Sequence, residues 1–157
     1  MKQPNILLTR IDNRLVHGQV AITWTTSIGA NLIILVDDDV AEDKIQQSIM
    51  EITARSNDVG IRFFTIERTA NVIMNASTEQ KIFIVCRTPN TVRRLLEKGV
   101  ALTDINVGNM HFSEGKKQLS KKVYVDEKDL EDLRYIKNRG VNVYIQDVPS
   151  ATIEYIN

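Results

Sequence analysis

Residues 5–37 read NILLTRIDNRLVHGQVAITWTTSIGANLIILVD, and this stretch decides the fold. The apolar runs at 5–10 and 31–37 are predicted strands, because short runs rich in Ile, Leu and Val are typical of buried strands. Between them a helix is predicted from about Gln19 through Ile28, followed by Gly29 as a left-handed stop. A strand, a helix and a second strand in this order favour parallel pairing in an α/β fold.

The alternation continues along the chain. Further strands are predicted at 61–66, 81–86, 104–109, 122–126 and 141–147. Helix starts are predicted at Asp39 with Glu42, at Thr88 with Pro89, and at Asp126 with Asp129. The helix over 41–55 is expected to turn one stripe towards the sheet, formed by Ile45, Ile49 and Ile52. We therefore expect a single α/β domain over 1–157 with an open, twisted, mainly parallel sheet and helices on both faces.

Composition narrows the class of protein. The 20 basic and 20 acidic residues of the 157 cancel, so no global positive field indicates a nucleic-acid partner. The single cysteine, Cys86, cannot form an internal disulfide and ends an apolar run, which favours a buried thiol in a reducing compartment. No apolar stretch has the length of a signal-peptide core or a membrane span, so a cytoplasmic location is expected.

The reactive residue types concentrate between the first strand and the first helix, in TRIDNRLVHGQ at 9–19. Such a loop lies at the carboxyl ends of the strands, where open α/β sheets bind ligands. A neutral His17 is a competent nucleophile for a phosphoryl group, Arg10 and Arg14 could supply fork-shaped donors, and Gly18 would let backbone amides approach. Asp12 would orient the ring or an arginine.

These residues alone leave other readings open. Two arginines and an aspartate in a loop also form ordinary solvated ion pairs, and a histidine beside a glycine is common at a helix start. Asp37, Asp38 and Asp39 invite comparison with response regulators, although Asp39 is better explained as a helix cap. Neither G-x-x-x-x-G-K-[ST] nor G-x-G-x-x-G occurs, which disfavours an ATP-dependent kinase, and two histidines give no zinc-ligand spacing. No cofactor or metal is expected.

The run RIDNRLVHGQV at 10–20, with Trp24 after it, resembles the active-site loop of the IIB components of the mannose/sorbose-type sugar phosphotransferase system. The similarity continues through NVGNMHFSEGKKQ at 106–118, VDEKD at 125–129 and GVNVYIQDVP at 140–149, so it covers nearly the whole chain. The segment NMHFSEGKKQ is most similar to the branch specific for N-acetylgalactosamine or galactosamine.

The resemblance implies a protein-phosphohistidine sugar phosphotransferase with a seven-stranded twisted sheet. His17 would carry the phosphoryl group on Nδ1 and Arg14 would help to hold it, while Arg10, Asp12, Gly18 and Gln19 match the motif as phosphate-binding or loop-supporting residues. The donor would be a IIA protein or domain, and the sugar would be presented by membrane IIC and IID subunits. His111 is a possible partner contact, a homo-oligomer is possible, and a non-catalytic partner-binding domain of the same fold is the alternative.

Overall fold

The computed structural model describes residues 3–156. Its strands are β1 (Asn5–Asp12), β2 (Leu32–Val36), β3 (Gly60–Phe64), β4 (Lys81–Cys86), β5 (Asp104–Asn109), β6 (Lys117–Ser120), β7 (Val123–Val125), β8 (Asn142–Ile145) and β9 (Glu154–Tyr155). Its α-helices are α1 (Val20–Ile28), α2 (Lys44–Arg55), α3 (Ile66–Val72), α4 (Pro89–Glu97) and α5 (Glu127–Asn138), with short 3₁₀ turns at Val40–Glu42 and Ile73–Asn75.

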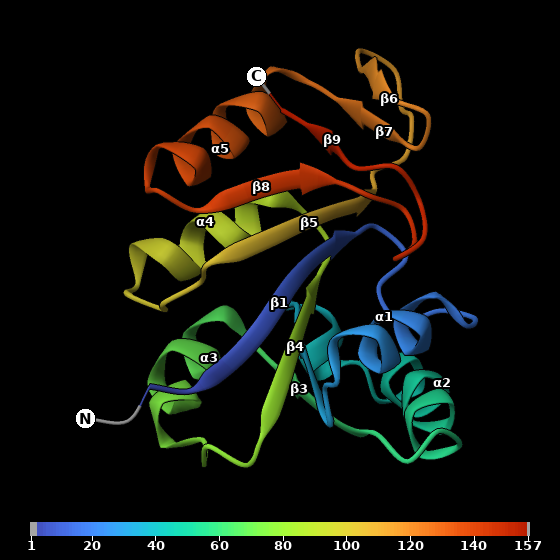
Figure 1. Ribbon diagram of the computed structural model, residues 1–157, viewed down its shortest axis with the longest axis vertical. Helices are drawn as coiled ribbons and strands as arrows, with labels where there is room; N and C mark the ends of the chain where they lie inside the picture. The colour runs from blue at the N-terminus through green and yellow to red at the C-terminus, as the bar shows by residue number, and fades with distance from the viewer. Residues whose placement is uncertain (1–2, 157) are drawn as a thin grey trace.

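The main sheet has seven strands in the order β3-β2-β4-β1-β5-β8-β9, which confirms the predicted α/β class (Figure 1). All neighbours pair in parallel except β9, which is antiparallel to β8. Strand β1 lies between β4 and β5, so its carboxyl end is near the middle of one sheet edge. The loops after β1, β2, β4 and β5 all leave from that edge, where ligands bind in folds of this type.

The membership of the sheet differs from the prediction at one strand. The predicted strand at 122–126 is present as β7, but it pairs with β6 in a separate antiparallel hairpin. The seventh strand of the main sheet is instead β9, a two-residue segment at Glu154–Tyr155 that was not predicted. Both of its residues are exposed, so the period-two burial pattern that indicates a strand is missing.

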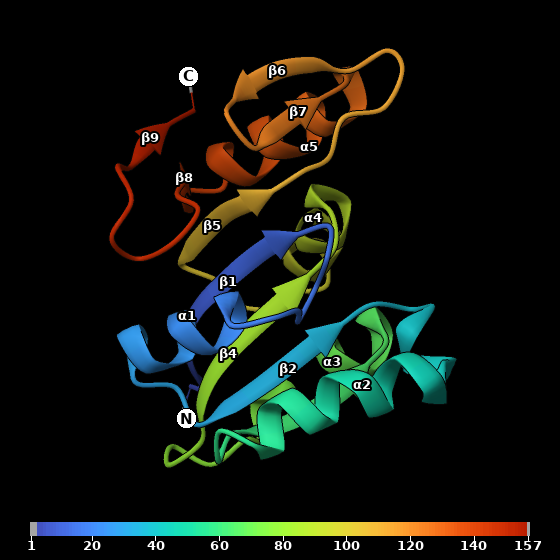
Figure 2. The same ribbon diagram turned by 90° about the vertical axis from the view of Figure 1, so that its right-hand side faces the viewer.

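Helices cover both faces of the sheet, as predicted. Figure 2 shows α1 and α2 in front of the sheet and α3 and α4 behind it. Alternate residues of the central strands point to the two sides, so Ile33 and Phe83 join the core beneath α1 and α2, while Ile34 and Ile84 join the larger core on the other face. Trp24 is 3% exposed and packs in the first of these cores.

The helix caps are partly those predicted. Asp126 and Asp129 form a reciprocal capping box at the start of α5, and Pro89 occupies the first turn of α4 after Thr88. The prediction for α2 was wrong in position, because the cap is Asp43, whose carboxylate accepts from the backbone N–H groups of the first turn. The side chain of Asp39 makes no cap hydrogen bond; it precedes the 3₁₀ turn instead.

The buried face of α2 also differs from the prediction. Ile45, Ile49 and Ile52 are 77%, 63% and 67% exposed, so the isoleucine stripe faces away from the sheet. The residues buried on α2 are Gln47, Met50 and Ala54. Gln47 can lie inside because its side-chain amide donates to the Val40 carbonyl oxygen at 2.8 Å.

Among residues 3–156, no helix combines the length and the apolar character needed to cross a membrane.

Candidate functional site

The loop between β1 and α1 is held in an unusual backbone conformation. Leu15 has φ of +60° and Gly18 has φ of +48°, and both values lie in the left-handed region. Glycine adopts this region without strain, whereas leucine does so at a cost of about 1–2 kcal/mol. Leu15 and Val16 are each only 4% exposed, so their side chains anchor the loop in the core. The loop is therefore anchored immediately before His17.

His17 is oriented by the carboxylate at the end of β1. Its Nε2 lies 3.4 Å from Oδ2 of Asp12, whose side chain is 1% exposed. An ionised carboxylate only accepts hydrogen bonds, so in the tautomer that forms a hydrogen bond here His17 donates from Nε2 and its lone pair is on Nδ1. The other Asp12 oxygen accepts from the Arg14 backbone N–H at 2.9 Å. Asp12 thus orients the ring, as the sequence suggested, and also shapes the loop.

Arg10 lies behind Asp12 and is enclosed by the protein. Its Nη2 is 3.2 Å from Asp12 Oδ2, and its Nη1 donates to Asn106 Oδ1 at 2.6 Å and to the Gln146 carbonyl oxygen at 3.2 Å. Burial lowers the pKa of Arg10, and the opposing influence of Asp12 favours its charged form. The guanidinium is thus committed to holding Asp12, which makes Arg10 a support of the loop.

Gly108 makes room for this buried arginine. A Cβ atom at position 108 would lie 2.0 Å from Arg10 Cζ and 2.2 Å from Nη2. No heavy-atom contact of that length is possible, so the Arg10 guanidinium could not occupy its position beside any residue with a side chain at 108.

His17 lines a shallow cavity of about 300 Å³. It is bounded by the β1–α1 loop, by helix α2 and by the end of β4. Its lining consists of Asn13, Arg14, Leu15, Val16, His17, Gln46, Ile49, Met50 and Arg87. Arg14 is exposed, and among the described residues no acid lies within ion-pair distance of its guanidinium. The structure therefore brings together one nucleophilic side chain and two arginines, an arrangement suited to an anion.

Asn13 joins three loops at the sheet edge. Its side-chain nitrogen donates to the Arg87 carbonyl oxygen at 2.7 Å, and its Oδ1 accepts from the His111 backbone N–H at 2.6 Å. His111 is exposed on the same edge of the sheet and does not line the His17 cavity. No local spacing marks Asn13 in the sequence, because its partners are remote along the chain.

The remaining predicted positions contribute backbone geometry. Gly18 supplies the left-handed turn before α1, and no heavy atom other than those of its chain neighbours lies within 4 Å of a Cβ built there. Gln19 is exposed at the start of α1, where its carbonyl oxygen accepts from Thr23, and its side chain forms no cap hydrogen bond. Neither residue lines the cavity.

The acidic run after β2 has structural partners. Asp37 forms an ion pair with Arg87 at 2.9 Å and accepts from the backbone N–H groups of Asp39 and Val40, and Asp38 accepts from the Ile66 backbone N–H. Within residues 3–156, no group of three or more His, Cys, Asp or Glu side chains is arranged to hold a metal ion.

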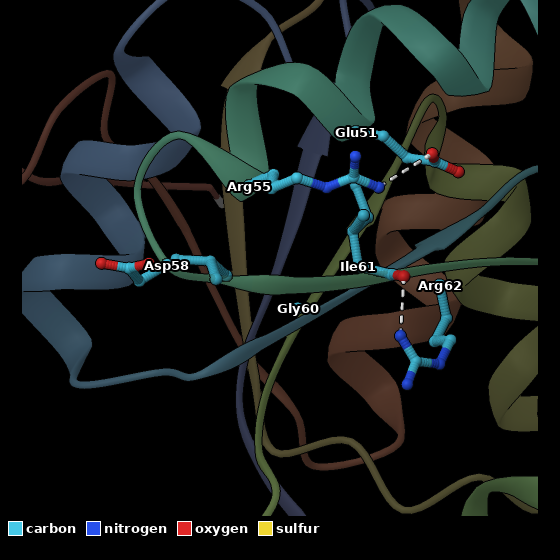
Figure 3. A pocket seen from close by; sticks show the side chains of 7 residues that line it. Glu51, Arg55, Asp58, Gly60, Ile61 and Arg62 are labelled. Carbon is cyan, nitrogen blue, oxygen red and sulfur yellow. Dashed lines mark hydrogen bonds and ion pairs between the residues drawn. The ribbon is translucent and has the colours of Figure 1, made fainter.

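A larger cavity of about 500 Å³ lies at the opposite edge of the sheet, where β3 begins (Figure 3). Both of its arginines are engaged locally: Arg55 pairs with Glu51 at 3.9 Å, and Arg62 donates to the Ile61 carbonyl oxygen at 3.0 Å. No histidine or cysteine lines it. His17, Arg14 and Arg87 lie together at the other edge.

The family model described as "PTS system sorbose subfamily IIB component" matches residues 6–157. The chain belongs to this IIB family. It is 68% identical over 156 residues to the N-acetylgalactosamine-specific phosphotransferase enzyme IIB component 1 of Escherichia coli, with 99% of each chain covered. The crystal structure of the N-acetylgalactosamine-specific IIB component 1 from Escherichia coli superposes with a TM-score of 0.96, covering 98% of this chain and 100% of that one.

A more distant relative has a different organisation. The mannose-specific EIIAB component of Escherichia coli is 36% identical over 149 residues, which are 90% of this chain and 44% of that protein. The family assignment agrees with the resemblance found in the loop sequence, and the fold of the structural relative agrees with the sheet described above. As a IIB component, the chain is classed with the phosphotransferases of the sugar phosphotransferase system.

Proposed function

We propose that this IIB component is a phosphocarrier that accepts a phosphoryl group on Nδ1 of His17 and transfers it to an incoming sugar. The observation that carries the proposal is the orientation of the imidazole. Its Nε2 faces the buried carboxylate of Asp12, which leaves Nδ1 as the free nucleophile beside a cavity lined by two arginines. Asp12 is a positioning residue in this scheme, and Arg10 holds Asp12 in place.

The reaction consists of two phosphoryl transfers. In the first, the Nδ1 lone pair of His17 attacks phosphorus, the P–N bond of the donor phosphohistidine breaks, and its electron pair returns to the donor ring. In the second, a sugar hydroxyl oxygen attacks phosphorus, the P–Nδ1 bond breaks and the hydroxyl proton leaves to a base. Arg14 supplies a planar fork for the phosphoryl oxygens, whose charge spreads during each transfer.

The relatives support the identity of the partners. The sugar proposed is N-acetylgalactosamine, because the 68% identical relative is named as specific for it. The donor proposed is the phosphohistidine of a IIA protein, since the mannose-specific relative carries A and B parts in one component. Membrane IIC and IID subunits would present the sugar, which places this chain in the cytoplasm and, during transfer, at the inner face of the membrane.

Mass spectrometry tests the proposal. The protein is incubated with phosphoenolpyruvate, the general phosphotransferase proteins and a cognate IIA, and the His17→Gln variant is compared with His111→Gln as a matched histidine control. The expected result is one acid-labile phosphate on the peptide that contains His17, lost in the first variant and kept in the second. No adduct from an active donor would identify a non-catalytic binding domain, and a hydroxylamine-sensitive adduct would place the phosphate on an aspartate.

A further inference from the structure

Arg87 lies where β4 ends and shares the cavity of His17 with Arg14. It comes from a strand next to β1 in the sheet but 70 positions away from His17 in the chain. Its side chain is 39% exposed, so the guanidinium is partly accessible from the cavity. No motif in the sequence marked this residue.

Two of the three guanidinium nitrogens of Arg87 donate to protein acceptors. Nε donates to Asp37 Oδ2 at 2.9 Å, and Nη1 donates to the Asn13 carbonyl oxygen at 3.2 Å. Asp37 is itself fixed, because its other oxygen accepts from the backbone N–H groups of Asp39 and Val40. Among the residues that the structure describes, none accepts a hydrogen bond from Nη2 of Arg87. A rigidly placed donor is therefore left over beside the cavity.

We propose that Arg87 is a second phosphoryl-binding arginine of the transfer site, positioned by Asp37 and donating to the phosphoryl oxygens while His17 carries the group. This inference rests on the proposed function of His17. Arg14 is an exposed side chain on a loop and must be ordered when the anion binds, whereas Arg87 is already ordered by its two protein acceptors. Preorganised donors of this kind stabilise the spread charge of a phosphoryl transition state.

The ion pair between Arg87 and Asp37 also suits a site that must release its phosphoryl group again. Asp37 balances the charge of Arg87, as Asp12 balances that of Arg10, so Arg14 is the one arginine at the site whose charge no nearby acid offsets. Arg87 therefore adds a hydrogen bond without adding a full uncompensated charge. The phosphoryl group is held in position but is not trapped by an excess of positive charge.

The test compares Arg87→Gln with Arg94→Gln. Arg94 is a matched control, because it also pairs with an acid of the same run, Asp38, at 3.8 Å, but it lies on α4 and does not line the cavity. The rate of phosphate transfer from IIA is measured by rapid quench and is expressed per folded molecule. We expect Arg87→Gln to slow acceptance by about tenfold to a hundredfold, and Arg94→Gln to leave the rate within twofold of the wild type.

A second readout separates binding from folding. The ³¹P signal of the phosphorylated wild type and of Arg87→Gln is titrated with pH, because loss of a bound donor raises the pKa of the phosphoryl group and a purely structural role does not. Arg87→Lys should restore folding stability beside Asp37 but not the planar donor, so it should remain slow.

Three results would overturn the inference. An Arg87→Gln rate equal to that of Arg94→Gln would remove Arg87 from the site and leave the carrier role of His17 intact. A loss of total activity that only matches the unfolded fraction, with an unchanged rate per folded molecule and an unchanged ³¹P titration, would assign Arg87 to folding alone. A wild-type protein that takes no phosphate from an active donor would remove the proposed function and this inference with it.

Discussion

Replacing Gly108 with Ala tests whether the buried Arg10–Asp12 pair is as tightly enclosed as the structure indicates. The new methyl would lie 2.0 Å from Arg10 Cζ, so the guanidinium must leave its position. It would then lose its contacts with Asp12 and Asn106, and Asp12 would remain buried at 1% exposure without its partner. Breaking a buried ion pair in this way typically costs about 3–5 kcal/mol.

The expected change is large enough to measure directly. A loss of about 3–5 kcal/mol removes a large part of the roughly 5–15 kcal/mol by which domains are stable. In a chain of this length each kcal/mol lowers Tm by about 2–4 °C, so Tm should fall by roughly 6–20 °C. Urea unfolding followed by the fluorescence of Trp24 gives the free energy of unfolding. The same probe reports on the native state, because Arg10 Cζ lies 5.5 Å from the Trp24 ring centroid.

Gly60→Ala is the matched control. Gly60 also has an ordinary negative φ, but a Cβ there would meet the end of the flexible Leu32 side chain at 3.2 Å, which can move. Its stability should stay within about 1 kcal/mol of the wild type, with unchanged native fluorescence. If Gly108→Ala also lost less than about 1 kcal/mol and left the Trp24 emission unchanged, the enclosure of Arg10 deduced from the structure would be wrong.

Three further substitutions or treatments probe other parts of the molecule. Arg14→Lys should slow phosphate transfer at least about tenfold in the rapid-quench assay with little change in Tm, because an ammonium cannot reproduce the planar fork of a guanidinium. Unaltered kinetics would remove Arg14 from the mechanism. Ile52→Ser should change the free energy of unfolding by less than about 0.5 kcal/mol, whereas Met50→Ala should cost about 2–5 kcal/mol; the reverse ranking in urea would contradict the assigned face of α2. Burial raises the pKa of the Cys86 thiol, so alkylation at pH 8 should be at least about tenfold slower in the folded protein than in urea. Equal alkylation rates would show that the thiol is accessible in the folded protein.

The central strands and their order of alternation with helices could be predicted from sequence, because each carries a strong local signal. The runs at 5–10 and 81–86 are apolar, short and bounded by polar residues, and the structure has strands there. Strand β9 could not be found in this way. Two exposed residues have no pattern of their own, and their pairing with β8 depends on where the chain returns in space.

The face of α2 shows a different limit. The spacing of Ile45, Ile49 and Ile52 correctly predicts one stripe on a helix but does not state which stripe meets the sheet. The buried stripe contains Gln47, whose polar group is satisfied by a carbonyl oxygen seven positions away. This carbonyl oxygen belongs to Val40, in the 3₁₀ turn before α2. The apolar pattern of α2 alone does not include this hydrogen bond and therefore predicts the wrong buried face.

Much of the candidate site could be recognised because its motif is contiguous. Asp12 ends β1, and the loop that follows contains Arg14, His17 and Gly18. In the structure the Asp12 carboxylate contacts both Nε2 of His17 and the backbone N–H of Arg14. Arg87 could not be recognised, because it reaches the same cavity only through the pairing of β4 with β1 in the sheet. Residues that contribute through tertiary contact leave no local spacing to detect.

The backbone and the side chain at position 15 favour different residue types. The backbone of Leu15, with φ of +60°, is most easily adopted by glycine or asparagine, whereas its side chain, 4% exposed, occupies space that needs a large apolar group. Burial of a leucine contributes about 1.5–3 kcal/mol, which is enough to offset a backbone strain of about 1–2 kcal/mol. A glycine would relieve the backbone and empty the core, and a β-branched residue would keep the volume and worsen the strain. A single substitution at position 15 therefore has to satisfy the backbone and the core at once, which few side chains other than leucine can do.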